Sequence, residues 1–472
     1  MREYIGSITG TVIAVLYIIC VFTAVYGNLK LQPWAGVNIF VLCIPVVIIA
    51  GITFLCRFIG SSYKRFVELS GIIFLTALIL RLIMLFVCNT EPVSDFKKTY
   101  DIAYGMCRMN FSDVPAYIRE ESPFYYYEWP MHIPFILFEY FILKIFGGSV
   151  FSIQAVSAFF GAASCFILCF IGKGLHNNRC GLIAGFIYAV LPLPVLFTGV
   201  LSNQHIATFF FILAVYFIVC MPAKKRYVNL LLIGISIAVS HLMRPEMQVM
   251  AMAYVCLEIY RFVKYKNIGR KEIIDFIINA FMPIVISLVI VISVSFAFTS
   301  YGLSGKSVMT GNLKYKIATG LNRESGGQWN EADMQEVNNE KLLGQYIKER
   351  VSQPGLVAFM MEKLAGQYGT YNYLWCEPKD GTIEKELYSS VTNIPMLIIF
   401  LLILTGMIKR FGKFNSSEIF LMIITIGYFM TFAIIEVQDR YNYFMIPVFI
   451  LMACIGLAGN DNQLKETNQV YP

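Results

Sequence analysis

Uninterrupted apolar runs recur along nearly the whole chain, such as VIAVLYIICVFTAV near its start and IVISLVIVISVSFAF before residue 300. A helix of about 17 to 25 such residues crosses about 30 Å of hydrocarbon. Strands of a membrane barrel would alternate apolar and polar residues, and these runs do not. Hydrophobic residues make up 57% of the chain and charged residues 14%. The sequence therefore predicts an all-α polytopic membrane protein.

Twelve membrane spans are predicted from these runs. They cover residues 7–27, 36–56, 67–89, 150–172, 180–197, 204–221, 228–243, 246–263, 273–299, 391–408, 416–435 and 441–458. This division gives four parts: two N-terminal helices in 1–66, a membrane module in 67–300, a polar segment in 301–390, and the C-terminal helices with a short tail in 391–472.

Positive charge alternates between the loops that join these spans. If the N-terminus is cytoplasmic, every cytoplasmic loop is basic, as the positive-inside rule requires. The cations are Arg57, Lys64, Arg65, Lys173, Arg179, Lys224, Lys225, Arg226, Arg261, Lys264, Lys266, Arg270, Lys271, Lys409, Arg410 and Lys413. The net charge of +7 is thus a topology signal and does not indicate a nucleic-acid partner.

Residues 131–147 resemble a span but would invert every later loop if they crossed the membrane. They contain Glu139 and Lys144, and a charge at mid-bilayer costs about 2.5 to 3.5 kcal/mol on insertion scales. We therefore expect a helix in the outer interface. The loop 90–149, the turns near 200 and 244, the segment 301–390 and the turn near 438 then face outward, and both termini are cytoplasmic.

Asp95 stands at the start of the first long outer loop, in EPVSDFKKTYDIAYGM. Helical spacing of Phe96, Tyr100 and Ala103 predicts an amphipathic helix along the outer leaflet, with Asp95 in its first turn. Partial desolvation there would favour a general base. An alternative is that Asp95 only caps the helix.

Two arginines lie near the same predicted surface. Arg244, in HLMRPE, is costly at that depth unless an anion meets it, and a lipid phosphate would serve. A structural ion pair with Glu246 or Asp95 is the alternative. Arg440, in EVQDRY, falls on the same face and is a second candidate for phosphate. Arg81, inside the third span, is expected to form an ion pair or to snorkel.

Further outward-facing polar and aromatic residues are candidates for substrate binding. Aromatic residues also form membrane belts, and Ser or Asn at a helix start is ordinary capping, so those interpretations stay open. The candidates are Tyr100, Asp101, Tyr127, Glu128, His132, Asn203, Gln204, His205, His241, Glu246, Trp329 and Glu436. The segment 301–390 is too short for an ordinary catalytic domain and is expected to shape or cover a site.

Other kinds of catalysis lack support in the sequence. No HxxxH pair, GxSxG elbow, Walker motif or GxGxxG motif is present, so neither a required metal nor a nucleotide site is expected. The twelve cysteines show no CxxC spacing and are interpreted as small core residues, although Cys107 and Cys376 could pair on the outer side.

The segments PVSDFKKTYDIAYG, WPMHIPFILFEYFILKIFGGSVF, LSNQHIATFFFILAVYF and HLMRPE together resemble the C-type glycosyltransferases. More narrowly, residues 67–300 resemble bacterial relatives of protein O-mannosyltransferases and of the lipid A aminoarabinose transferase. The first external acidic residue is the catalytic base in that family and corresponds to Asp95 here. The two helices in 1–66 are additional, and Phe96 stands where eukaryotic mannosyltransferases have Glu.

The resemblance implies an inverting enzyme of the cell membrane. Its donor would be a sugar on polyprenyl phosphate and its acceptor an extracytoplasmic hydroxyl. Asp95 would be the base, and Arg244 and Arg440 would bind the donor phosphate. A lipid-linked polysaccharide polymerase and a non-enzymatic lipid-linked glycan transporter are the alternatives.

Overall fold

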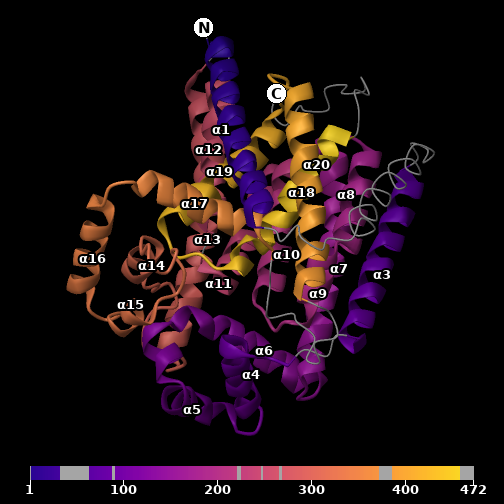
Figure 1. Ribbon diagram of the computed structural model, residues 1–472. Coiled ribbons are helices and arrows are strands. Elements are labelled where there is room, and N and C mark those ends of the chain that lie inside the picture. Colours follow the sequence, from indigo (N-terminus) through magenta and orange to yellow (C-terminus); the bar gives the residue numbers. More distant parts are fainter. Residues whose placement is uncertain are drawn as a thin grey trace.

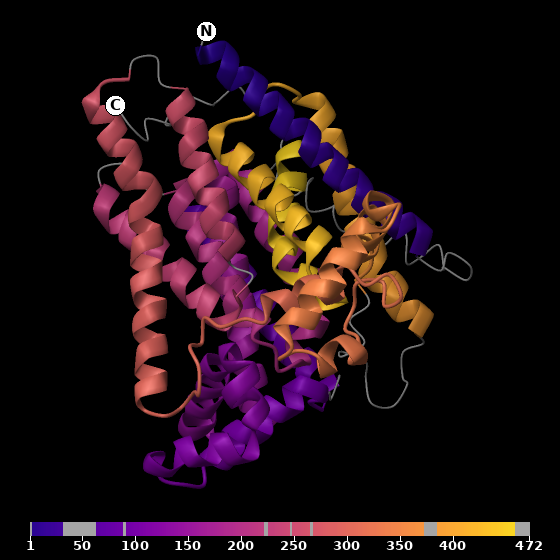
Figure 2. The same ribbon diagram turned by 90° about the vertical axis from the view of Figure 1, so that its left-hand side faces the viewer.

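The computed structural model describes residues 2–31, 63–87, 91–220, 225–245, 248–264, 268–371 and 385–457. A bundle of helices runs through most of the molecule (Figures 1 and 2). They are α1 (Arg2–Leu31), α3 (Tyr63–Val87), α7 (Val150–Leu175), α8 (Asn178–Val190), α9 (Pro192–Leu196), α10 (Gln204–Cys220), α11 (Arg226–Met243), α12 (Gln248–Val263), α13 (Arg270–Ser300), α18 (Lys385–Lys409), α19 (Ser416–Ile434) and α20 (Ile446–Leu457).

Eight helices in the described part are long and apolar enough to span a membrane, and a bent pair, Asn178–Val190 with Pro192–Gly199, makes a ninth. Two shorter helices, α10 and α12, pack into the same bundle. Eleven predicted spans coincide with these helices, and the span 36–56 lies outside the described residues. The prediction of an all-α polytopic membrane protein is confirmed.

The bundle has a protein-covered centre and a lipid-facing periphery. In α3 and α13, 28% of the most apolar 18-residue stretch is buried, against 78% in the span that contains α20. The exposed side chains on the outer helices are apolar, such as Ile79 on α3 and Val289 on α13. This is the arrangement required of a bundle whose solvent is hydrocarbon.

Arg81 on α3 is fully buried and hydrogen-bonds to backbone carbonyls. Its Nη2 donates to the carbonyl of Tyr188 and its Nη1 to that of Ala189, both at 3.3 Å. Pro192 has no N–H to donate to the Tyr188 carbonyl, and the chain bends by 53° there. Arg81 therefore satisfies a carbonyl that the proline leaves open. The expected ion pair or snorkelling role was wrong.

Short helices cover one end of the bundle, opposite the Arg2 end of α1 and the Leu457 end of α20 (Figure 1). They are α4 (Ser94–Met106), α5 (Val114–Glu121) and α6 (Ile133–Phe146). At about 1.5 Å per residue, the 14 residues of α6 are too short to cross a bilayer. The structure thus agrees with an interfacial helix at 131–147.

The segment 301–371 forms a helical lobe beside this end, with α14 (Leu313–Gly320), α15 (Glu331–Gln335), α16 (Glu340–Ser352) and α17 (Leu356–Gly369). Its last helix, α17, crosses α1 at very short range. A Cβ on Gly27 would lie 1.8 Å from the Ala365 carbonyl oxygen, and one on Gly369 would lie 2.4 Å from the Asn28 nitrogen. Glycine at both positions therefore lets the lobe dock against the membrane bundle.

Candidate functional site

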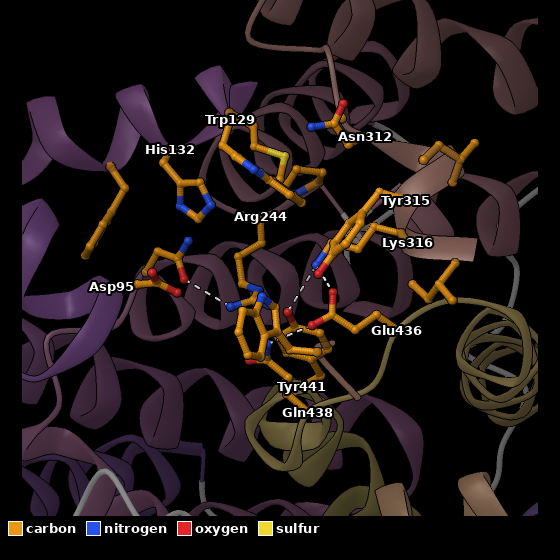
Figure 3. Close-up of a pocket in the computed structure, with 18 of the residues that line it drawn as sticks. Asp95, Trp129, His132, Arg244, Asn312, Tyr315, Lys316, Glu436, Gln438 and Tyr441 are labelled. Atoms are coloured by element: carbon orange, nitrogen blue, oxygen red, sulfur yellow. Dashed lines mark hydrogen bonds and ion pairs between the residues drawn. The ribbon is translucent and has the colours of Figure 1, made fainter. Parts of the chain in front are cut away.

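A cavity of about 520 Å³ lies where the outer helices, the lobe and the bundle meet (Figure 3). Its polar lining residues come from six separate segments of the sequence. They include Asp95, Tyr125, Trp129, His132, Asn203, Arg244, Asn312, Tyr315, Lys316, Trp329, Glu436, Gln438, Arg440 and Tyr441. A volume of this size suits a small-molecule site.

Asp95 enters the cavity from the first turn of α4. Its carboxylate lies 3.8 Å from Arg440 Nη2 and accepts a hydrogen bond from the Tyr125 hydroxyl at 3.4 Å. The side chain is 48% exposed, so the carboxylate stays accessible. The N-cap residue of α4 is Val93, which has no side-chain capping bond, and Asp95 is the second residue of the helix. Asp95 therefore does not occupy the capping position.

The residue before Asp95 has an unusual backbone. Ser94 has φ of 51°, the one positive φ outside glycine among the described residues. Side chains rarely adopt this conformation, and it costs on the order of 1 to 3 kcal/mol. The turn that aims Asp95 into the cavity is therefore strained.

Arg244 and Arg440 line the cavity from the turn after α11 and from the 3-10 segment Asp439–Met445. Arg244 Nη1 donates to Asn203 Oδ1 at 3.1 Å, and Arg440 Nε donates to Gln438 Oε1 at 2.9 Å. Both guanidinium groups lie beside the ring of Tyr441, at 5.0 Å and 5.9 Å from its centroid. Neutral oxygens and an aromatic ring thus orient two cations toward one space.

Lys316 on α14 forms a buried ion pair with Glu436. Glu436 Oε1 also accepts from Gln438 Nε2 at 2.9 Å, and its backbone N–H donates to the Lys316 carbonyl at 2.8 Å. Burial opposes the charged form of Lys316, but Tyr441 and Glu436 outweigh it and raise the pKa of Lys316. This pair therefore fixes the lobe to the 435–438 loop of the bundle.

Close packing holds the same contact together. A Cβ on Gly320, at the end of α14, would lie 2.2 Å from the Ile435 carbonyl carbon. Lys363 on α17 donates to the carbonyls of Gly320 and Ile435. Gln367 Nε2 donates to the Gln438 carbonyl at 2.9 Å. The lobe thus positions the loop that carries Glu436 and Gln438.

His132 lies near Asp95 on the cavity wall, at the end of a 3-10 turn (Figure 3). Burial lowers its pKa to about 4, and Arg244, Lys316 and Arg440 contribute in the same direction. His132 is therefore neutral near pH 7. The charged lining residues are then three cations, Arg244, Lys316 and Arg440, and two carboxylates, Asp95 and Glu436.

Seven of the predicted site residues line this cavity: Asp95, His132, Asn203, Arg244, Trp329, Glu436 and Arg440. Glu436 does so as the partner of Lys316, which fits a positioning role as well as substrate binding. Trp329 is 54% exposed. The structure thus brings these seven residues together in one cavity.

Seven other predicted residues do not line it: Tyr100, Asp101, Tyr127, Glu128, Gln204, His205 and His241. Gln204 donates to the Arg440 carbonyl, and His205 packs between Phe197 and Tyr443. These two support the wall from behind. Glu246, like Cys376 of the considered Cys107 pair, lies outside the described residues.

The structure adds residues that sequence reasoning missed. Gln438 and Tyr441 flank Arg440 in EVQDRY, so their proximity to a predicted site residue was a usable signal. Trp129 belongs to the outward-facing aromatic run YYYEW, which suited a sugar-binding surface and a membrane belt equally well, so it was not chosen as a site residue. Asn312 and Lys316 carried no signal, because nothing in the sequence fixes the path of the lobe.

The chain is similar to known proteins in part of its sequence and in its fold. Residues 130–295 match the family model described as dolichyl-phosphate-mannose-protein mannosyltransferase. No curated protein matches the chain. The archaeal oligosaccharyltransferase AglB from Archaeoglobus fulgidus, in complex with an inhibitory peptide and a dolichol-phosphate, is similar with a TM-score of 0.52 and 16% identity. The apo form of the Archaeoglobus fulgidus oligosaccharyltransferase gives a TM-score of 0.51 and 15% identity.

Both of these structural matches cover 84% of this chain and 51% of the solved chain, so the chain spans about half the length of those structures. At such identities the likeness shows the fold. Together with the family match, it confirms the resemblance to C-type glycosyltransferases that the sequence motifs indicated. The chain has the fold of that class and is a multi-pass membrane protein.

Proposed function

We propose that this chain is a membrane glycosyltransferase that moves a sugar from a polyprenyl-phosphate donor to an acceptor hydroxyl. The observation that carries the proposal is the placement of Asp95 beside Arg440 and Arg244 in one cavity. Glycosyl transfer from a lipid phosphate requires a base for the attacking hydroxyl and cations for the departing phosphate. The two requirements meet within this cavity.

The reaction proceeds by direct displacement. Asp95 accepts the proton of the acceptor hydroxyl as its oxygen attacks the anomeric carbon. The bond from that carbon to the phosphate oxygen breaks, and its electron pair stays on the polyprenyl phosphate. Attack opposite to the leaving group inverts the configuration. Arg244 and Arg440 neutralise the negative charge that builds up on the departing phosphate.

The printed descriptions of the similar proteins support a lipid-linked donor. The matched family is named for dolichyl-phosphate mannose, and the AglB structure contains a dolichol-phosphate. The cavity lies at the end of a bundle whose outer helices expose apolar side chains, which suits a donor that stays in the bilayer. The donor sugar and the acceptor are left open by these observations.

The proposed site faces the extracytoplasmic side. The basic loops alternate along the sequence in the pattern of the positive-inside rule, with the N-terminus inside. In that orientation α4, α5 and α6 lie at the outer surface, opposite the Arg2 end of α1 (Figure 1). An acceptor of the cell envelope would reach the cavity from there.

The direct test uses purified protein in liposomes with polyprenyl-phosphate sugars and an acceptor mixture from the envelope. Release of polyprenyl phosphate with transfer of one sugar supports the proposal. Elongation of a lipid-linked oligosaccharide would identify a polymerase instead. Movement of the donor between leaflets without a new glycosidic bond would identify a transporter.

The phosphate assignment has its own test, with a matched control at the other end of the same helix. Arg244 follows α11, and Arg226 begins it and pairs with Asp275 outside the cavity. Arg244→Ala should weaken polyprenyl-phosphate binding by about tenfold or more, because a charged hydrogen bond is lost. Arg226→Ala should leave it unchanged. If Arg244→Ala bound polyprenyl phosphate as tightly as Arg226→Ala, Arg244 would not be a phosphate-binding residue.

A further inference from the structure

The cavity wall across from Asp95 carries a buried hydrogen-bond donor without a partner. This wall, here called the Trp129 wall, consists of Trp129, Asn312, Tyr315 and Lys316 (Figure 3). Trp129 is 6% exposed, and its indole Nε1 has no hydrogen-bond partner among the described residues. Buried tryptophan N–H groups usually have one, because an unmade bond is costly. An acceptor atom of a ligand would satisfy this donor.

The backbone around Trp129 is built to hold it there. Trp129 stands between a π-helical turn, Phe124–Glu128, and a 3-10 turn, Pro130–His132. Single π-turns are rare and frequent at functional sites. Two hydrogen bonds from the lobe hold the π-turn in place. The Gly305 N–H donates to the Tyr126 carbonyl, and Asn312 Nδ2 donates to the Glu128 carbonyl, both at 3.0 Å. The direction of the indole is thus fixed by two parts of the chain.

Side-chain packing fixes the ring as well. Tyr315 meets the Trp129 ring edge-on, with centroids 5.6 Å apart and planes at 88°. The Lys316 ammonium lies 5.1 Å from the Trp129 ring centroid. The indole therefore cannot turn toward another acceptor without breaking these contacts.

The charges near Trp129 select the kind of ligand. Lys316 is already paired with the Glu436 carboxylate, so this part of the cavity is close to neutral. Arg440 lies beside Asp95, and both arginines lie beside Tyr441, so an anion is favoured in that part of the cavity. A fixed N–H donor beside a paired ammonium and carboxylate suits hydroxyl groups, which both donate and accept. A phosphate would bind more favourably beside Arg244 and Arg440 than at the Trp129 wall.

We propose that the Trp129 wall binds the hydroxyl groups of a pyranosyl unit, with the Trp129 N–H donating to a sugar oxygen. The inference rests on the proposed function and deepens it, because it places sugar and phosphate on opposite sides of one cavity. The pyranosyl unit belongs either to the donor or to a glycan acceptor. Trp129 is in either case a specificity residue and not a base.

The test compares wild type with Trp129→Phe, which keeps the aromatic ring and removes the N–H. The probes are polyprenyl phosphate, polyprenyl-phosphate mannose and polyprenyl-phosphate glucose, bound by the protein in nanodiscs. Tyr126→Phe is the control, because it removes a hydroxyl from the same π-turn outside the cavity lining. Thermal stability of all three proteins reports on folding.

Trp129→Phe should bind a sugar-bearing lipid about tenfold more weakly while its affinity for polyprenyl phosphate is unchanged. This result assigns the wall to the donor sugar. Unchanged lipid binding with about a tenfold higher KM for a glycan acceptor assigns it to the acceptor. If wild type transfers sugar, and Trp129→Phe changes neither the affinity for sugar-bearing lipid nor the KM for the acceptor, the inference is wrong and the proposed function stands. A wild-type protein that binds no polyprenyl phosphate overturns both.

If Trp129→Phe does not fold, wild-type protein with ¹⁵N-labelled indoles replaces it. The Trp129 signal is assigned by elimination with phenylalanine variants of Trp34, Trp329 and Trp375. Sugar-bearing lipid or glycan acceptor should shift the Trp129 signal, and polyprenyl phosphate alone should not. A signal that does not respond to either sugar overturns the inference.

Discussion

The lobe contains an internal ion pair with a buried carboxylate, Arg350–Asp333, and its removal should unfold the lobe locally. Arg350 on α16 donates to both carboxylate oxygens of Asp333, at 2.8 and 3.0 Å, and to the Ala318 carbonyl at 2.7 Å. Asp333 is 1% exposed and also accepts from Thr319 and Asn322. The pair thus joins α14, α15 and α16.

Arg350→Met leaves the Asp333 carboxylate buried without its cation. Breaking a buried pair by removing one partner costs roughly 3 to 5 kcal/mol, so local opening of 313–352 should become about 100- to 5000-fold more frequent. Lys314→Met is the control, because the Lys314–Glu340 pair also joins α14 to α16 but its side chains are 52% and 76% exposed. Solvent screens that pair, so its loss should change local opening little.

Hydrogen exchange, read by mass spectrometry on protein in nanodiscs, measures how often residues 313–352 open locally. Peptides within 313–352 should lose protection in Arg350→Met and keep it in Lys314→Met, while peptides of α7 and α20 serve as an internal reference. Because Tyr315 and Lys316 line the cavity, transfer should fall in parallel. Equal exchange in the two variants would refute the structural role given to the Arg350–Asp333 pair.

Two further predictions concern α4 and α6. At Ser94, which has φ of 51°, glycine should be tolerated within about 1 kcal/mol, whereas Ser94→Val should cost about 1 to 3 kcal/mol and reduce transfer. Thermal stability and turnover of the two variants test this prediction. If Ser94→Val matched Ser94→Gly in both, the backbone at Ser94 would not be strained. Burial raises the pKa of Glu139 on α6 well above its ordinary 4.5. The folded state therefore retains a proton that the unfolded state releases, and stability falls as pH rises above 4.5. Glu139→Gln should fold, and its thermal stability should vary less than that of wild type between about pH 5 and pH 8. An equally steep pH dependence in the variant would show that Glu139 does not cause it.

Hydropathy and charge were sufficient to predict most of the fold. The apolar runs marked the spans, since a helix in lipid must present apolar side chains over a fixed length. The alternating cations then placed residues 131–147 in the interface, which a hydropathy threshold alone would have missed. That single assignment put Asp95, Asn203, Arg244 and Arg440 at one end of the bundle, where the structure has them.

The rotation of the helices and the path of the lobe could not be predicted in the same way. Gln204 and His205 begin α10, which is apolar on all sides, so no polar stripe indicated which face they occupy. Both turn out to be buried behind the cavity wall. Lys316 lies in a polar segment with many other charges, and its pairing with Glu436 depends on tertiary contacts 120 residues apart.

Single-turnover transfer by Asp95→Asn tests the central claim most directly. The amide keeps the shape of the side chain and cannot accept the hydroxyl proton, so the rate of sugar transfer should fall by about 10² to 10⁴ while polyprenyl-phosphate sugar still binds. Asp101→Asn, on the same helix but outside the cavity, should retain the wild-type rate. A near-wild-type rate of transfer by Asp95→Asn would contradict the account.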